Sequence, residues 1–226
     1  MASEIFLYWG SGSGPCWRVM LALEEKGLSG YGNKLISFDK TEHKSEEILK
    51  LNPRGQVPTF KHGNIVINES MAAIVYLEDT FKGQGTELIP SEPTKKALVL
   101  QRTMESNNLA EKTGKLLYYF FRNKDNIDEA VVSPLKADLK DEVLIWEGYL
   151  KELGGDSFIA GKDFTLADCC LFPAVAMLVR QGVDLDKSAP NLGKYYKTVK
   201  DRPSAQASWP PHFKESPNQD RFKDVM

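Results

Sequence analysis

The sequence has few cysteines, little net charge and no long apolar run. Its 226 residues contain three cysteines, Cys16, Cys169 and Cys170, and an odd number with two adjacent does not suit a disulfide framework. The formal net charge of −2 argues against nucleic acid as the main partner. The first apolar run, residues 5–9, is too short and too aromatic for a signal peptide, and none reaches the roughly 18 residues of a membrane span. These absences predict a reduced, cytoplasmic protein that binds neither nucleic acid nor a membrane.

The glycine-rich stretch after the first apolar run also lacks several familiar motifs. Gly10, Gly12 and Gly14 are wrongly spaced for the G-x-G-x-x-G motif of dinucleotide-binding proteins, and no Gly-Lys-Ser/Thr follows to make a P-loop. A redox C-x-x-C pair would need a cysteine at Ser13, and a glutaredoxin-like C-P-x-C pair would need one at Gly14. The stretch is therefore neither a nucleotide-binding loop nor a dithiol redox motif.

What the stretch does contain is the pattern strand, Gly/Ser turn, helix. Residues 5–9 read as a buried strand, Pro15 suits the first position of a helix, and Gly27 suits its end. One helical face is apolar, at Cys16, Val19, Met20 and Leu23. Hydroxyls and backbone N–H groups at a helix start attract an anion, and they suit a thiolate. The serines could equally be only N-caps.

The rest of the first 80 or so residues continues as an α/β unit. The patterns predict further strands at residues 34–38, 56–60 and 65–67, and helices at 45–51 and 68–81. The order is βαβαββα, with one parallel pair and one hairpin. Residues 83–93 are rich in Gly, Pro, Ser and Thr and predict a linker between domains.

No strand pattern follows the linker, so the remainder is predicted to be helical. Helices are expected at residues 94–121, 134–153, 166–179 and 190–200. The third begins with a capping box from Thr165 to Asp168 and is apolar on nearly every side, which predicts the central buried helix. The tail from Arg202 contains four prolines and is expected to be irregular, with Trp209 and Phe213 packing it down.

Four motifs now make the chain resemble the cytosolic glutathione transferases. They are Ser13 two residues before Pro15, the N-P-x-x-x-V-P segment at 52–58, the E-S-x-A-I box at 69–74 and the capping box at 164–168. Together with an α/β domain followed by a helical domain, they cover essentially the whole chain. The sequence is most similar to the rho class among the serine-type enzymes, with theta, delta and zeta nearby.

The resemblance implies a fold and an activity. The fold is a thioredoxin-like domain at 1–82, a linker at 83–93 and an all-α domain at 94–226. The activity is that of a glutathione transferase in detoxification, a cytoplasmic homodimer whose glutathione thiolate attacks electrophiles such as an aryl halide, an epoxide or an enal. Glutathione is the co-substrate, with no other cofactor and no metal. Ser13 is the expected donor to the thiolate, Ser11 is the substitute, and Arg18 adds positive potential.

The resemblance also implies residues that bind the substrates. Those for glutathione are His43, Lys44, Gln56, Val57, Pro58, Glu69 and Ser70. Pro58 would be cis and would leave the backbone of Val57 to pair with the peptide. Glu69 would receive the γ-glutamyl ammonium and Ser70 its carboxylate, while His43, Lys44 or Gln56 would meet the glycyl carboxylate. The pocket for the hydrophobic electrophile is expected between the domains, near Asn108, Leu109 and Lys112.

Two other functions remain open at this stage. A non-catalytic interaction protein could share the fold, and a thiol-disulfide oxidoreductase could use Cys16, although its helical spacing predicts a buried, inert side chain. Glu69 and Ser70 could be only a helix cap. His62 and His212 have no partners in the sequence pattern and are interpreted as structural or exposed.

Overall fold

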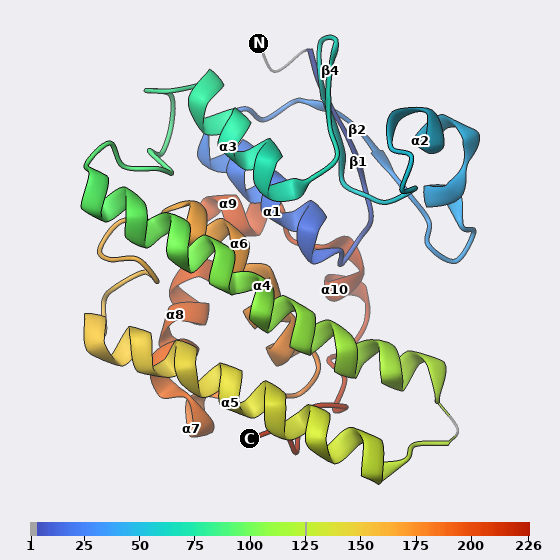
Figure 1. The fold of residues 1–226 in the computed structure, drawn as a ribbon, viewed down its shortest axis with the longest axis vertical. Helices are drawn as coiled ribbons and strands as arrows, with labels where there is room; N and C mark the ends of the chain where they lie inside the picture. Colours follow the sequence, from blue (N-terminus) through green and yellow to red (C-terminus); the bar gives the residue numbers. More distant parts are fainter. Residues whose placement is uncertain (1–3, 125) are drawn as a thin grey trace. The chain divides into compact units, whose positions relative to one another are not determined.

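The computed structural model describes residues 4–124 and 126–226, and it divides into two compact units (Figure 1). The first unit contains the chain up to Ile89 together with Pro203–Glu215, and the second contains Pro90–Arg202 together with Ser216–Met226. The first three residues of the predicted first domain lie outside the described residues. The predicted second domain, 94–226, differs from this division because residues 203–215 group with the first unit.

A four-stranded mixed sheet forms the centre of the first unit. Its strands are β1 (Ile5–Trp9), β2 (Gly32–Leu35), β3 (Thr59–His62) and β4 (Ile65–Ile67), in the order β2-β1-β3-β4. β2 is parallel to β1, whereas β3 is antiparallel to both β1 and β4. The helical segments are α1 (Gly14–Glu25), the 3₁₀ helix η2 (Glu42–Lys44), α2 (Glu46–Leu51) and α3 (Ser70–Thr80). The predicted βαβαββα order of a thioredoxin-like domain is confirmed.

Two strands are shifted from their predicted positions. β2 ends at Leu35, where its parallel register reaches Trp9, the last residue of β1. β3 begins at Thr59 opposite Tyr8, directly after Pro58, because a proline has no N–H to donate to the ladder. Local apolar patterns therefore located both strands but misplaced their ends by a few residues.

The buried face of α1 packs against α3. Cys16, Val19 and Leu23 of α1 are fully buried, as are Ile74 and Leu77 of α3. This confirms the apolar face predicted for α1, apart from Met20, which is partly exposed. Burying such side chains contributes roughly 1.5–3 kcal/mol each, so the α1–α3 contact holds the start of α1 in a fixed place.

The first half of the predicted linker belongs to the first unit rather than hanging between domains. The backbone N–H of Thr86 donates to the carbonyl of Glu25 over 2.9 Å. Nζ of Lys26 lies 2.9 Å from Oε2 of Glu78 in a buried ion pair, and the N–H of Leu88 donates to the same carboxylate over 3.1 Å. Leu88 is fully buried, so this segment folds back on the end of α1.

Substituting Gly85 tests this attachment, with Gly83 as a matched control. Both glycines have a positive φ, +60° and +79°, but a Cβ at Gly85 would lie 2.2 Å from the carbonyl oxygen of Glu25, whereas Gly83 has open space. Gly83→Ala should cost only about 1–2 kcal/mol of backbone strain. Gly85→Ala should cost about 1–3 kcal/mol more through overpacking and expose residues 83–89 to limited proteolysis. Equal melting temperatures for the two variants would contradict the attachment.

The second unit is built from helices (Figure 1). These are α4 (Pro93–Arg122), α5 (Glu129–Leu153), α6 (Leu166–Arg180), α7 (Leu185–Ser188) and α8 (Pro190–Lys200). α4 packs along α5 and against α6, and α6 is the predicted central helix, with nearly every side chain buried. In the residues that the structure describes, no helix combines the length and apolarity needed to cross a membrane.

α5 begins earlier than predicted. Asp128 caps it by accepting a hydrogen bond from the N–H of Ala130 over 2.9 Å, so Pro134 lies inside the helix and not at its start. α7 was not predicted at all, and its four residues begin at an aspartate cap, Asp184. Capping side chains decided both helix starts, because they satisfy backbone N–H groups that have no partner within a helix.

The tail was predicted to be irregular, but it contains two short helices, α9 (Pro203–Ala207) and α10 (Pro211–Glu215). Both belong to the first unit. Nε1 of Trp17 in α1 donates to Oγ of Ser208 over 2.9 Å. Trp209 and Phe213 lie edge-on to Trp17, with ring centroids 5.1 and 6.0 Å away. The prediction that these two aromatic residues pack the tail down is confirmed.

Candidate functional site

The predicted glutathione-binding segments meet at one edge of the sheet. The register pairs Trp9 with Leu35 and Tyr8 with Thr59, so the end of β1 lies beside the end of β2 and the start of β3. Phe60 pairs with Ile67 at the end of β4, which leads into α3. Segments that are far apart in the sequence therefore leave or enter the sheet at the same edge, all within the first unit.

Ser13 is the N-cap of α1. Its Oγ accepts a hydrogen bond from the N–H of Cys16 over 3.5 Å, and its own N–H donates to the carbonyl of Gly10 over 3.1 Å. Its hydroxyl also meets the buried thiol of Cys16, and this hydrogen bond lowers the pKa of that thiol. The Gly10–Gly14 segment, here called the serine turn, thus holds a hydroxyl that accepts from its helix and whose proton has only a weakly accepting thiol as partner among the described residues.

Ser11 has a different environment from Ser13. Its Oγ lies 2.6 Å from Nδ1 of His212 in a hydrogen bond. Sequence patterns interpreted His212 as structural or exposed and so missed this contact. The one available signal was the Trp-Pro-Pro-His-Phe segment at 209–213, whose aromatic and proline residues already indicated a tail fixed to the protein surface.

Cys16 is unsuited to redox chemistry. Its side chain is fully buried, and burial raises the pKa of its thiol to about 11, although the hydrogen bonds to Ser13 and to the backbone of Gly10 lower it. A reactive cysteine needs an accessible thiolate. Cys169 and Cys170 are also buried, so none of the three cysteines supports the oxidoreductase alternative, and the prediction of an inert Cys16 is confirmed.

The loop before β3 leaves the backbone of Val57 outside the β1–β3 ladder. The Val57–Pro58 peptide bond is cis, as the resemblance implied. The β1–β3 ladder starts at Thr59, so Val57 lies beyond its last pair. The carbonyl of Gln56 accepts from Nδ2 of Asn52 over 2.9 Å and from Oγ1 of Thr59 over 3.1 Å. These bonds hold the loop while the Gln56 side chain remains exposed.

His43 and Lys44 lie in η2, and their side chains differ in whether they have hydrogen-bond partners. Nζ of Lys44 donates to the carbonyl of Arg54 over 2.8 Å, which joins η2 to the loop before β3. The ring of His43 packs against Phe38 with centroids 5.5 Å apart, and its buried Nδ1 has no hydrogen-bond partner among the described residues. Because the ammonium of Lys44 already binds the Arg54 carbonyl, the partly exposed His43 is the better placed of the two to receive a ligand.

The start of α3 presents an exposed carboxylate. Glu69 is the N-cap residue, but its side chain makes no capping hydrogen bond among the described residues, and it is exposed. Ser70, the first residue of the helix, is only 7% exposed. Asn68 fixes the approach to the helix through Nδ2, which donates to the carbonyl of Leu51 over 3.0 Å. The carboxylate of Glu69 is therefore not used by its own helix.

Four other predicted positions are buried in α1 or belong to α4 of the second unit. Arg18 is on the buried side of α1, at 5% exposure. In α4, Asn108 is exposed, whereas Leu109 is fully buried in the helical unit. Nζ of Lys112 lies 3.0 Å from a carboxylate oxygen of Asp138 and 3.3 Å from one of Glu142, which commits its charge to α5.

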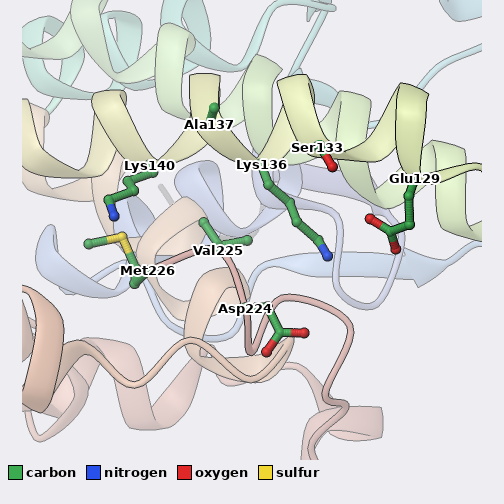
Figure 2. A pocket seen from close by; sticks show the side chains of 8 residues that line it. All are labelled: Glu129, Ser133, Lys136, Ala137, Lys140, Asp224, Val225 and Met226. Atoms are coloured by element: carbon green, nitrogen blue, oxygen red, sulfur yellow. The ribbon is translucent and has the colours of Figure 1, made fainter.

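The second unit has a cavity of about 400 Å³ that none of the predicted residues line. It lies between α5 and the end of the chain, and Figure 2 shows Lys136 and Asp224 approaching it from these two sides. Glu129 and Lys140 also line it, so its charges are mixed. Across the part of the chain that the structure describes, no group of His, Cys, Asp and Glu side chains is arranged to hold a metal ion.

Comparison with known proteins assigns the family. Residues 13–80 match the family described as Glutathione S-transferase, N-terminal domain, and residues 109–203 match Glutathione S-transferase, C-terminal domain. The chain is 49% identical over 227 residues to Glutathione S-transferase A of Pleuronectes platessa, covering 100% of both chains. The chain belongs to the glutathione S-transferase family. The non-catalytic and oxidoreductase alternatives are accordingly set aside.

Solved structures agree with this assignment. The transferase is similar to a glutathione S-transferase from the Antarctic clam Laternula elliptica, at 47% identity and a TM-score of 0.90 over 99% of this chain and 100% of that one. It also resembles a delta-class glutathione transferase of Nilaparvata lugens, at 29% identity and a TM-score of 0.78 over 98% and 100% of the chains. The transferase conjugates glutathione, its co-substrate, to electrophiles, on a thioredoxin-like domain joined to a helical one.

Proposed function

We propose that this transferase is serine-type and that Ser13 stabilises the glutathione thiolate. The observation that carries this is the capping geometry, in which Ser13 accepts from the N–H of Cys16 and gives its own proton to no stronger acceptor than a thiol among the described residues. A free thiol has a pKa of about 8.5, and lowering it by about two units requires roughly 2.7 kcal/mol of preference for the thiolate. One charge-assisted hydrogen bond of about 1.5–3 kcal/mol, with about 0.3–1 kcal/mol from the dipole of α1, supplies that preference. Arg18 adds positive potential from within α1.

The remaining edge of the sheet binds the peptide in this proposal. Val57 pairs its backbone with the cysteinyl residue of glutathione, in the manner of an added strand, with Pro58 setting its orientation. Ser70 and the first N–H groups of α3 bind the γ-glutamyl carboxylate, and Glu69 binds the ammonium. His43 binds the glycyl carboxylate, with Lys44 and Gln56 beside it.

The finer assignments of class, site and assembly are part of the same proposal. The resemblance noted in the sequence supports the rho class, with Ser13 two residues before Pro15 as the motif of the serine-type enzymes. The family resemblance supports detoxification of electrophiles in the cytoplasm. A homodimer is supported by exposed apolar side chains such as Met104 of α4, which is 57% exposed. Of the three positions predicted for the electrophile, we retain Asn108, because its side chain is exposed.

Glu69→Ala tests the peptide-binding half of the proposal. Removing the carboxylate should weaken glutathione binding about ten- to hundredfold, the worth of one charge-assisted hydrogen bond. The effect should fall on the KM for glutathione and not on kcat, because Glu69 contacts the end of the peptide far from sulfur. Steady-state kinetics with varied glutathione, together with a direct binding titration, measures this.

Asp79→Ala is the matched control, since Asp79 is an exposed carboxylate at the other end of α3. It should leave the KM for glutathione unchanged. A fall in kcat at constant KM in Glu69→Ala would contradict the role assigned to Glu69, and so would an equal loss of binding in both variants.

A further inference from the structure

The tail places an imidazole on the serine turn from the far end of the chain. Nδ1 of His212 lies 2.6 Å from Oγ of Ser11, although 201 positions separate them in the sequence. Both residues belong to the first unit, and Figure 1 shows α10 beside the start of α1. The bond therefore joins the turn that precedes α1 to a segment that has no part in the sheet.

His212 also covers the next residue of the turn. Gly12 has a φ of +77°, and a Cβ there would lie 2.5 Å from Cε1 and 3.0 Å from Nε2 of His212. Gly12 thus satisfies two demands at once, since it adopts the left-handed region without strain and leaves room for the ring. The imidazole contacts two successive residues of the serine turn, one by a hydrogen bond and one by close packing.

Aromatic packing fixes the helix that carries His212. Its ring lies edge-on to that of Phe213, with centroids 4.7 Å apart, and Phe213 lies edge-on to Trp17 of α1. Trp209 packs on the rings of both Trp17 and Phe213. Oγ of Ser208 accepts a hydrogen bond from the indole N–H of Trp17. Such edge-to-face pairs are favourable geometries for aromatic rings. They hold α10, which carries His212, in a fixed position against the start of α1.

We propose that His212 is a positioning residue for the serine turn, acting through Ser11 to hold the conformation in which Ser13 meets the glutathione sulfur. This rests on the proposed role of Ser13. The N–H of Ser13 donates to the carbonyl of Gly10 across the turn, so a shift of Ser11 and Gly12 between them changes the direction of the Ser13 hydroxyl. Hydrogen bonds weaken steeply as their geometry departs from linearity, and small displacements of a reacting group reduce rate strongly.

The test compares His212→Ala with His212→Asn, whose amide can occupy the place of Nδ1. His212→Ala should lower kcat about three- to tenfold, the range expected for one hydrogen bond, and should leave the KM for glutathione nearly unchanged. His212→Asn should recover most of the lost kcat. Lys214→Ala, on the exposed side of α10, is the control for disturbance of the tail and should behave as the parent enzyme.

A double-mutant cycle with Ser11→Ala shows whether the effect passes through Ser11. The double variant should lose no more kcat than either single variant, because the two side chains act as a pair. The role of His212 is overturned if His212→Ala retains full kcat, or if Lys214→Ala loses as much kcat as His212→Ala. It is also overturned if His212→Asn recovers none of the lost kcat, or if the kcat losses of His212→Ala and Ser11→Ala multiply in the double variant. Ser13→Ala, assayed in parallel, separates the two proposals: an unchanged thiol pKa there removes the role of Ser13 itself, whereas a shift there without a loss in His212→Ala removes only that of His212.

Discussion

Replacing Ser13 by alanine is expected to raise the pKa of the enzyme-bound glutathione thiol by about 1–2 units, the share of one charge-assisted hydrogen bond. Conjugation near pH 7 should then fall about ten- to hundredfold. At higher pH the variant should recover, because solvent hydroxide then supplies the thiolate that the enzyme no longer favours. Thiolate absorbance of the complex and kcat/KM across pH measure both effects. Glutathione affinity at high pH should change little, since Glu69, Ser70 and Val57 remain.

Ser11→Ala is the matched control on the same turn. Because Oγ of Ser11 is bonded to His212, this variant should lose no more than about tenfold in rate and show a smaller change of thiol pKa than Ser13→Ala. A larger shift for Ser11→Ala would assign the thiolate to Ser11. If neither variant shifts the thiol pKa, the backbone N–H groups of the turn with Arg18 become the better account.

Asp168→Ala is expected to have the largest effect on stability. The carboxylate of Asp168 is completely buried and accepts from the N–H of Ile159 over 3.0 Å, the N–H of Thr165 over 2.7 Å and Oγ1 of Thr165 over 3.0 Å. Alanine leaves two buried backbone N–H groups unpaired and removes the capping box of α6, a loss of about 4 kcal/mol. Denaturant unfolding measures it, and the folded fraction should bind glutathione with unchanged affinity, because Asp168 lies in the helical unit.

The same residue should make stability depend on pH. Burial raises the pKa of Asp168 from 3.8 to about 6, despite hydrogen-bond donors that favour the carboxylate. The folded state then binds the proton more tightly than the unfolded state, so this contribution is fully present below about pH 4 and is lost as pH rises through about 6. Two units correspond to about 3 kcal/mol, and Asp168→Ala should destabilise more at low pH than at neutral pH.

Asp163→Ala is the control for that experiment, because Asp163 is an exposed carboxylate five residues away in the same stretch. It should change stability by less than about 0.5 kcal/mol at any pH. An Asp168→Ala variant that unfolds as the parent does but no longer binds glutathione would mean that Asp168 belongs to the site and not to the scaffold.

The sequence by itself determined the features that depend on neighbouring residues. The strand–turn–helix at Ile5–Glu25, the β4 strand and the capping box of α6 were all predicted from residues a few positions apart. Such signals are local because a cap or an amphipathic face is formed within one or two helical turns. Family motifs then pointed to glutathione, and the segments that carry those motifs leave or enter the sheet at the same edge.

Only the tertiary structure decided where distant segments return. The pattern predicted a linker at 83–93, but Leu88 is buried against α3, and residues 203–215 of the tail belong to the first unit. Leu109 and Lys112 were predicted near an electrophile pocket, and the structure shows Leu109 fully buried and Lys112 paired with Asp138 and Glu142 within the helical unit. The bond between Ser11 and His212 spans 201 positions. No pattern within one element encodes such a pair, because what brings the two side chains together is the packing of Trp17, Trp209 and Phe213 across the whole length of the chain.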